Sequence, residues 1–191
     1  MTSMFSWGVD RALHVAVEAH QGQFRKGPEL MPYAVHPVHV GMILIRWGAD
    51  EEVIQAGLLH DVIEDCEGWT VERLRDRFGE RVASIVAELS EDKSLSWKER
   101  KRIGIEHVPG LSNEAALVKA ADQLHNLRSL VSALETAEDP DALWARFSGG
   151  REGTLRVAVG MVEALAERLQ PSQEAALREA LEALRRPAAG S

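Results

Sequence analysis

Apolar residues recur every three or four positions along most of this chain, the spacing that places them on one face of an α-helix. The alternation of apolar and polar residues that is typical of half-buried β-strands is absent. N-cap residues such as Asp50, Thr70 and Ser112 precede apolar stretches, and glycines such as Gly22 and Gly48 follow them. The pattern predicts helices over 8–21, 36–47, 50–65, 71–78, 82–89, 97–107, 113–134, 155–169 and 171–186, with a short helical turn after 139.

A single all-α domain accounts for this pattern. No internal repeat, low-complexity tract or linker interrupts the sequence, so we expect one helical bundle over residues 1–191. The helix after Asp50 is apolar nearly all round as far as Leu59 and should be buried at the centre. Residues 23–35 and 148–153 are predicted as loops, the second being the more flexible because it holds three glycines. Residues 187–191 should fray.

Composition narrows the class of protein. Apolar residues make up 45% and charged residues 27% of the 191 positions, as in ordinary globular domains. No apolar run approaches the ~18 residues of a membrane span, and the start of the chain lacks a secretory signal pattern. We therefore expect a cytoplasmic protein without a membrane partner. Cys66 is the only cysteine, which excludes an intramolecular disulfide and a Cys-rich zinc site.

The charge balance restricts the ligands. Thirty acidic and 22 basic side chains give a net charge of −8. Binding to a nucleic-acid polymer normally needs a basic surface, so we expect no such partner. A small anionic substrate remains compatible with this balance, provided that a bound cation or a local basic cluster offsets its charge.

Four ionisable residues stand at the end of the most apolar predicted helix, namely His60, Asp61, Glu64 and Asp65. Residues four apart on a helix differ in direction by only ~40°, so His60 should share a face with Glu64, and Asp61 with Asp65. Such groups at a buried helix end are costly unless something compensates them. Imidazole and carboxylate ligands together suit a divalent metal such as manganese, iron or zinc.

Two further segments supply matching side chains. Lys119, Asp122 and Asn126 are separated by helical offsets of three and four, which puts them on one face beside an apolar stripe. His36 lies at a predicted loop-to-helix junction. With His60–Asp61, these segments offer two histidines and two aspartates, and they leave coordination positions for water.

Each segment alone has a plainer explanation. A His–Asp pair is common by chance, a histidine before proline often only starts a helix, and an aspartate on a helix is usually solvated. The order of the set, on three helices of an all-α domain, favours the metal site. We assign structural or surface roles to the remaining histidines, which are His14, His20, His39, His107 and His125.

With these motifs assembled, the chain resembles the HD superfamily of metal-dependent phosphohydrolases, and within it the hydrolase domain of the RelA/SpoT homologues. The segments that carry the resemblance are AHQGQFRK (19–26), PYAVHP (32–37), LLHDVIED (58–65), FG (78–79), WKERK (97–101) and LVKAADQLHNLR (117–128). They cover about residues 8–132 of a single HD domain, and helices over 133–186 would complete it. The expected protein is a stand-alone small alarmone hydrolase.

The resemblance implies a manganese-dependent guanosine-3′,5′-bis(diphosphate) 3′-pyrophosphohydrolase, which converts (p)ppGpp to GDP or GTP and pyrophosphate. It implies one Mn²⁺ ion held by His36, His60, Asp61 and Asp122. Glu64 and Asp65 match the family's catalytic acidic pair. Either carboxylate could deprotonate the attacking water, and the sequence leaves that choice open.

Substrate contacts follow from the same resemblance. The implied substrate-binding residues are Arg25, Lys26, Lys119, Asn126 and, in the glycine-rich 148–153 loop, Arg151. Arginine can stack on a base or fork to a phosphate, which lysine cannot copy. A basic stretch at Lys98, Arg100, Lys101 and Arg102 is explained equally well by contact with the 5′ phosphates and by a solvated helix face.

Three departures from the family pattern leave alternatives open. The loop over 26–33 is about two residues longer, Cys66 replaces a frequent threonine, and no arginine–tyrosine pair follows Arg151. The alternatives are the same chemistry on an adenosine alarmone, (p)ppApp, or on NADPH, and a non-catalytic nucleotide-binding module. The sequence does not decide the oligomeric state.

Overall fold

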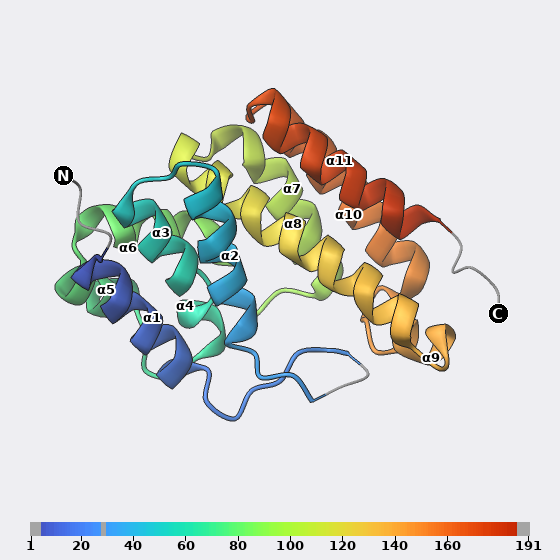
Figure 1. Ribbon diagram of the computed structural model, residues 1–191, viewed down its shortest axis with the longest axis horizontal. Helices are drawn as coiled ribbons and strands as arrows, with labels where there is room; N and C mark the ends of the chain where they lie inside the picture. Colours follow the sequence, from blue (N-terminus) through green and yellow to red (C-terminus); the bar gives the residue numbers. More distant parts are fainter. Residues whose placement is uncertain (1–4, 28–29, 187–191) are drawn as a thin grey trace.

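The computed structural model describes residues 5–27 and 30–186, and within them the chain is helical without a β-strand (Figure 1). This confirms the predicted all-α class. The elements are α1 (Trp7–Ala19), α2 (Val35–Arg46), α3 (Glu51–Leu59), α4 (Val62–Asp65), α5 (Val71–Phe78), α6 (Glu80–Leu89), α7 (Trp97–His107), the 3₁₀ turn η1 (Val108–Gly110), α8 (Asn113–Thr136), α9 (Pro140–Ala145), α10 (Gly150–Ala166) and α11 (Pro171–Arg185). None of these helices combines the length and the hydropathy that crossing a bilayer requires.

The capping signals in the sequence set most helix starts. The Asp50 carboxylate accepts hydrogen bonds from the backbone N–H groups of Glu52 and Val53, and the hydroxyls of Thr70 and Ser112 each accept from the residue three positions on. These bonds satisfy donors that a helix start leaves free. The predicted helix starts at these positions are confirmed.

Two hydrophobic cores meet along α8, which runs through the middle of the molecule in Figure 1. The first core joins α1, α2, α3, α5 and α6 to the N-terminal half of α8. The second joins the rest of α8 to α9, α10 and α11. Because α8 belongs to both cores, a residue near its middle is fixed by packing from both sides.

Helix α3 lies at the centre of the first core, as predicted. Every residue of α3 from Val53 to Leu59 is buried, and the helix packs on α1, α2, α6 and α8. A Cβ atom at Gly57 would lie 2.2 Å from Cδ1 of Leu44 on α2. The absence of a side chain there lets α2 and α3 approach closely, next to the His60–Asp61 segment.

The predicted continuous helix over 50–65 is wrong. Helix α3 ends at Leu59, and α4 begins at Val62. Asp61 adopts φ −96° and ψ −7°, in the bridge region outside the regular helix. Helical bonding resumes when the backbone N–H of Asp65 donates to the carbonyl of Asp61. Both pieces have helical periodicity, so the pattern of residues did not reveal the break between them.

The predicted loop over 148–153 is also wrong in part, because α10 already begins at Gly150. The glycines there serve packing: a Cβ at Gly149 would lie 2.3 Å from the Trp97 ring, and one at Gly153 would lie 3.4 Å from it. Arg151 is therefore an exposed residue in the first turn of a helix. The predicted fraying of residues 187–191 concerns positions outside the described residues.

Candidate metal centre and substrate pocket

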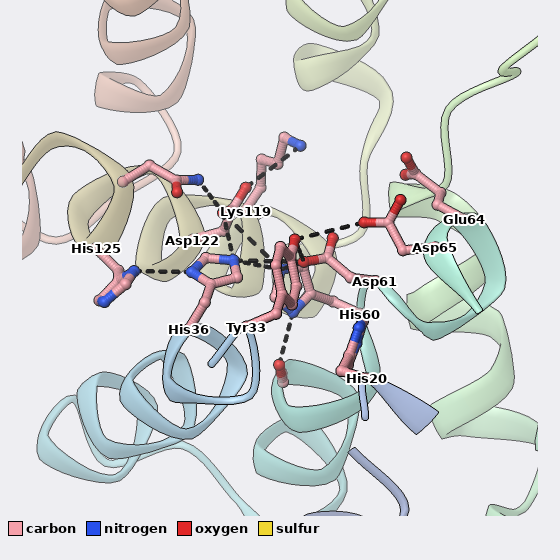
Figure 2. A network of polar contacts seen from close by, with 12 residues as sticks. His20, Tyr33, His36, His60, Asp61, Glu64, Asp65, Lys119, Asp122 and His125 are labelled. Atoms are coloured by element: carbon pink, nitrogen blue, oxygen red, sulfur yellow. Dashed lines mark hydrogen bonds and ion pairs between the residues drawn. The ribbon is translucent and has the colours of Figure 1, made fainter. Parts of the chain in front are cut away.

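The four predicted metal ligands converge between α2, the α3–α4 break and α8 (Figure 2). His36 lies in the first turn of α2, His60 and Asp61 form the break, and Asp122 lies near the middle of α8. The close approach of α2 to α3 brings the two histidines together. Asp122 then faces them from the helix that both cores share.

The polar atoms of these side chains surround one point. The Nε2 atoms of His36 and His60 are 3.2 Å apart. Asp61 Oδ2 lies 3.4 Å from the first nitrogen and 3.2 Å from the second. Asp122 Oδ1 lies 3.3 Å and 3.9 Å from the same two atoms. Ligands bonded to one ion at about 2.1 Å are separated by distances of this size.

The donor set suits a divalent cation. The Nδ1 atom of His60 is 2.8 Å from the carbonyl oxygen of Gly57. A carbonyl only accepts, so Nδ1 carries the hydrogen, and in the neutral ring Nε2 presents a lone pair to His36 and the carboxylates. His36, His60 and Asp122 each offer an atom within 4.8 Å of the others. A cation between them would accept the Nε2 lone pairs and offset the two carboxylate charges.

The charge states of Asp61 and Asp122 also suit a bound cation. Burial disfavours their charge, but the His36 and His60 rings hold the pKa of Asp61 well below its usual value. Burial also opposes ionisation of Asp122, whose pKa is nevertheless lowered by His36 and by the Lys119 ammonium. Lys119 Nζ lies 3.6 Å from Asp122 Oδ2. Both carboxylates are therefore ionised at neutral pH.

Tyr33 is a site residue that the sequence analysis did not assign. Its hydroxyl donates to Asp61 Oδ2 at 2.7 Å and lies 3.4 Å from Asp65 Oδ2. Burial and Asp61 raise the pKa of Tyr33, so the hydroxyl keeps its proton and remains a donor. The His20 ring packs against Tyr33 with centroids 4.7 Å apart, which agrees with the structural role predicted for that histidine.

His125 is a second residue with a role at the site. Its Nδ1 atom is 2.7 Å from Nδ1 of His36. Burial and the nearby charges of His36 and Arg25 lower the pKa of His125 to about 3, so the ring is neutral. It lies three residues after Asp122 on the same helix face, so helical spacing offered a signal for this position.

Glu64 and Asp65 lie beside the cluster in different surroundings. The predicted pairing of Asp61 with Asp65 agrees with the structure, since Tyr33 contacts both. Helix α3 ends before His60, and the predicted shared face of His60 and Glu64 stays a prediction. Glu64 Oε1 accepts a hydrogen bond from the backbone N–H of Glu91 at 2.8 Å. Asp65 forms an ion pair with Lys93, a loop residue that the sequence did not indicate.

Burial changes the basicity of Glu64. The loss of water around its carboxylate, and the nearby Asp61 charge, raise the pKa of Glu64, although the Glu91 backbone bond opposes them. A carboxylate with a raised pKa is a stronger base than one in water. Glu64 therefore holds a proton more readily than an exposed carboxylate does.

A cavity of about 610 Å³ adjoins the metal cluster at His125 and lies between α2, α8, α11 and loop residues 25–27 and 31. Among the described residues, its lining contains basic side chains and hydroxyls and no carboxylate: Arg25, Lys26, His39, His125, Arg128, Ser129, Ser132 and Thr136 stand among apolar residues and glycine. Cavities of ~300–1,000 Å³ hold small-molecule ligands. In a chain of net charge −8, this lining makes a local site for an anion.

The predicted substrate residues occupy different places. Arg25 reaches from the loop to Asn126 on α8, with Nη2 2.8 Å from Oδ1, and Asn126 in turn donates to Asp122. Lys26 lies over the Phe147 ring at 5.7 Å and is among the cavity-lining residues. Lys119 faces Asp122 rather than this cavity. Arg151 is not among the cavity-lining residues.

The basic stretch on α7 is largely neutralised by acids. Arg100 and Lys101 both form ion pairs with Glu91, and Arg102 pairs with Glu106. This arrangement favours the solvated or structural explanation over contact with phosphates.

The chain is similar to known proteins. The family model described as HD domain matches residues 12–155. "Guanosine-3′,5′-bis(diphosphate) 3′-pyrophosphohydrolase MESH1" of Xenopus tropicalis is 47% identical over 121 residues, which is 62% of this chain and 67% of that protein. The protein of the same name from Homo sapiens is 43% identical over 121 residues, again 62% and 67%. The matched segment thus spans about two thirds of each relative.

One solved structure resembles nearly the whole chain. That structure is described as "A metazoan ortholog of SpoT hydrolyzes ppGpp and plays a role in starvation responses". The match has a TM-score of 0.82 at 33% identity, and it covers 95% of this chain and 97% of that one. The helices after residue 132 are therefore included in the likeness.

Proposed function

This chain belongs to the HD domain family, and on that premise we propose that it hydrolyses the 3′-pyrophosphate of guanosine alarmones, converting (p)ppGpp to GDP or GTP and pyrophosphate. One observation carries the proposal: a buried His–Asp cluster with a neighbouring carboxylate pair lies beside a cavity whose described lining is basic and hydroxyl-bearing. The names of the relatives describe the same reaction.

The residues present fit one divalent ion, for which we propose Mn²⁺. His36, His60, Asp61 and Asp122 would hold it, and mixed imidazole and carboxylate ligands suit this metal. When bound, the ion acidifies water, polarises a phosphoryl oxygen and offsets substrate charge.

Glu64 and Asp65 form the catalytic pair. Glu64, with its raised pKa, takes the proton of the attacking water at its carboxylate. Asp65 is held by Tyr33 and Lys93, so it orients the water rather than accepting the proton. Water adds to the phosphorus bonded to the ribose 3′ oxygen, the bond to that oxygen breaks, and the 3′ oxygen takes up the proton from Glu64 as pyrophosphate departs.

The cavity binds the nucleoside end of the substrate. Arg25 stacks on a base or forks to a phosphate while Asn126 holds it in place. Lys26 and Arg128 offset the substrate charge, and Ser129 and Ser132 supply hydrogen bonds. The cytoplasmic location and the preference for guanine over adenine stay predictions.

Product analysis tests the proposal. Purified protein with Mn²⁺ is incubated separately with ppGpp, ppApp and NADPH, and the products are separated by anion-exchange chromatography. We expect ppGpp to give GDP and pyrophosphate in a reaction that chelation stops and fresh Mn²⁺ restores. Orthophosphate as the only phosphate product, or no turnover of ppGpp, would refute the proposed reaction. Turnover of ppApp or NADPH alone would reassign the substrate.

A further inference from the structure

The two histidines of the metal cluster are oriented by different kinds of partner. His60 Nδ1 donates to a backbone carbonyl, that of Gly57. His36 Nδ1 instead lies 2.7 Å from Nδ1 of His125, another imidazole. A carbonyl can only accept, but an imidazole nitrogen can donate or accept. The orientation of His36 therefore depends on the tautomer of His125.

The surroundings of His36 decide the direction of this bond. Its Nε2 atom faces His60, Asp61 and Asp122. A cation bound there needs the Nε2 lone pair, so the hydrogen of the neutral ring must be on Nδ1. His36 then donates and His125 accepts at Nδ1, which leaves the hydrogen of His125 on Nε2.

We propose that His125 is a positioning residue, whose Nδ1 lone pair holds the His36 ring in the tautomer and rotamer that present Nε2 to the metal. The inference rests on the metal role given under the proposed function. Partners of this kind on the far nitrogen of a ligand histidine typically change metal affinity by about 10- to 100-fold when removed.

The packing around His125 keeps its ring in place. The side chain is buried, and its ring lies 4.8 Å from the His36 ring and 5.0 Å from the His39 ring. Its second nitrogen points away from the metal cluster in Figure 2, and the residue lines the cavity proposed for substrate. His125 thus contacts both the metal ligand and the substrate site.

Two variants separate hydrogen bonding from ring packing. His125→Asn keeps an acceptor close to the Nδ1 position, whereas His125→Leu fills similar space without one. Mn²⁺ affinity is measured by the electron paramagnetic resonance signal of free Mn²⁺, with folding checked by circular dichroism. We expect His125→Leu to bind about 10- to 100-fold more weakly and His125→Asn to stay within about threefold of wild type. His14→Leu, which removes an exposed imidazole outside the metal cluster, should leave Mn²⁺ affinity unchanged.

Wild-type affinity in His125→Leu would overturn the inference, as would equal weakening in the Asn and Leu variants. If the wild type itself bound no Mn²⁺, the metal role in the proposed function would fail as well. A direct measurement needs no variant: ¹⁵N NMR of the zinc-loaded wild type should show a proton on His36 Nδ1 and a scalar coupling across the hydrogen bond to His125 Nδ1. A proton on His125 Nδ1 would contradict the proposed direction.

Discussion

At the scale of single residues, His60 links metal binding to protons. Burial disfavours its charge, but Asp61 and Asp122 together raise the pKa of His60 to about 9. In the metal-free protein at pH 7.5 the ring is therefore protonated, and a cation at Nε2 must displace that proton. We expect release of about one proton for each Mn²⁺ bound.

Calorimetry in two buffers measures this release. The binding enthalpy at pH 7.5 should differ between HEPES and Tris in proportion to their ionisation enthalpies, and the difference should shrink as the pH rises past about 9. Identical enthalpies in both buffers at pH 7.5 would show that His60 is already neutral.

Glu64 carries a prediction for turnover. We expect Glu64→Gln to lower kcat by about 10²- to 10⁴-fold, because the amide keeps the bond from Glu91 but cannot take a proton. Mn²⁺ affinity should stay unchanged, since Glu64 is not among the ligands. Because the pKa of Glu64 is raised, the acidic limb of the wild-type kcat profile should lie above the ordinary glutamate range. Glu67→Gln, an exposed neighbour, serves as control, and equal losses in both variants would argue against the role of Glu64.

The residue types and their spacing indicated which side chains would gather at this site. They did not indicate the contacts that support those side chains. The convergence of His36, His60, Asp61 and Asp122 could be predicted because two histidines and two aspartates from three segments of the chain are a chemically meaningful set. Lys93 left no signal, since it reaches Asp65 from a loop 28 residues away. Such contacts depend on how the helices pack rather than on local sequence.

At the scale of elements, local signals located helix starts but not every helix end. Caps at Asp50, Thr70 and Ser112 are satisfied within four residues, so the sequence alone shows them. The break at His60–Asp61 and the start of α10 against Trp97 depend on distant contacts. The break matters for function because it turns adjacent residues toward one metal position.

A substitution at Gly57 tests the close approach of α2 and α3. A Cβ there would meet Leu44, which is fully buried, so the two side chains would compete for the same space. We expect Gly57→Ala to lower the free energy of unfolding by about 1–3 kcal/mol, the usual cost of overpacking. Gly104→Ala is the matched control, since a Cβ in α7 would come no closer than 3.8 Å to another group. That change should be neutral or stabilising by up to about 1 kcal/mol, because alanine favours helix. Urea denaturation measures both, and equal shifts would contradict the close-approach argument.

At the scale of the whole molecule, the two cores share α8, and the metal cluster lies where they meet. The ligands come from α2, the α3–α4 break and α8, so their spacing depends on the first core directly. It depends on the second core only through the position of α8, against which α10 and α11 pack. The shared helix predicts that the two cores unfold together.

Two substitutions, one in each core, test whether the two cores unfold together. Leu59 in α3 and Leu177 in α11 are both fully buried, one in each core. Replacing either by alanine should cost about 2–5 kcal/mol through lost contacts and a residual cavity. Hydrogen exchange under native conditions then reports the opening free energy of the slowest amides in α3 and in α11. If α8 couples the cores, Leu177→Ala lowers protection in α3 as much as in α11, and Leu59→Ala does the same in the opposite direction. Loss of protection confined to the mutated core would mean that the cores unfold separately, and that the second core does not determine where Asp122 lies.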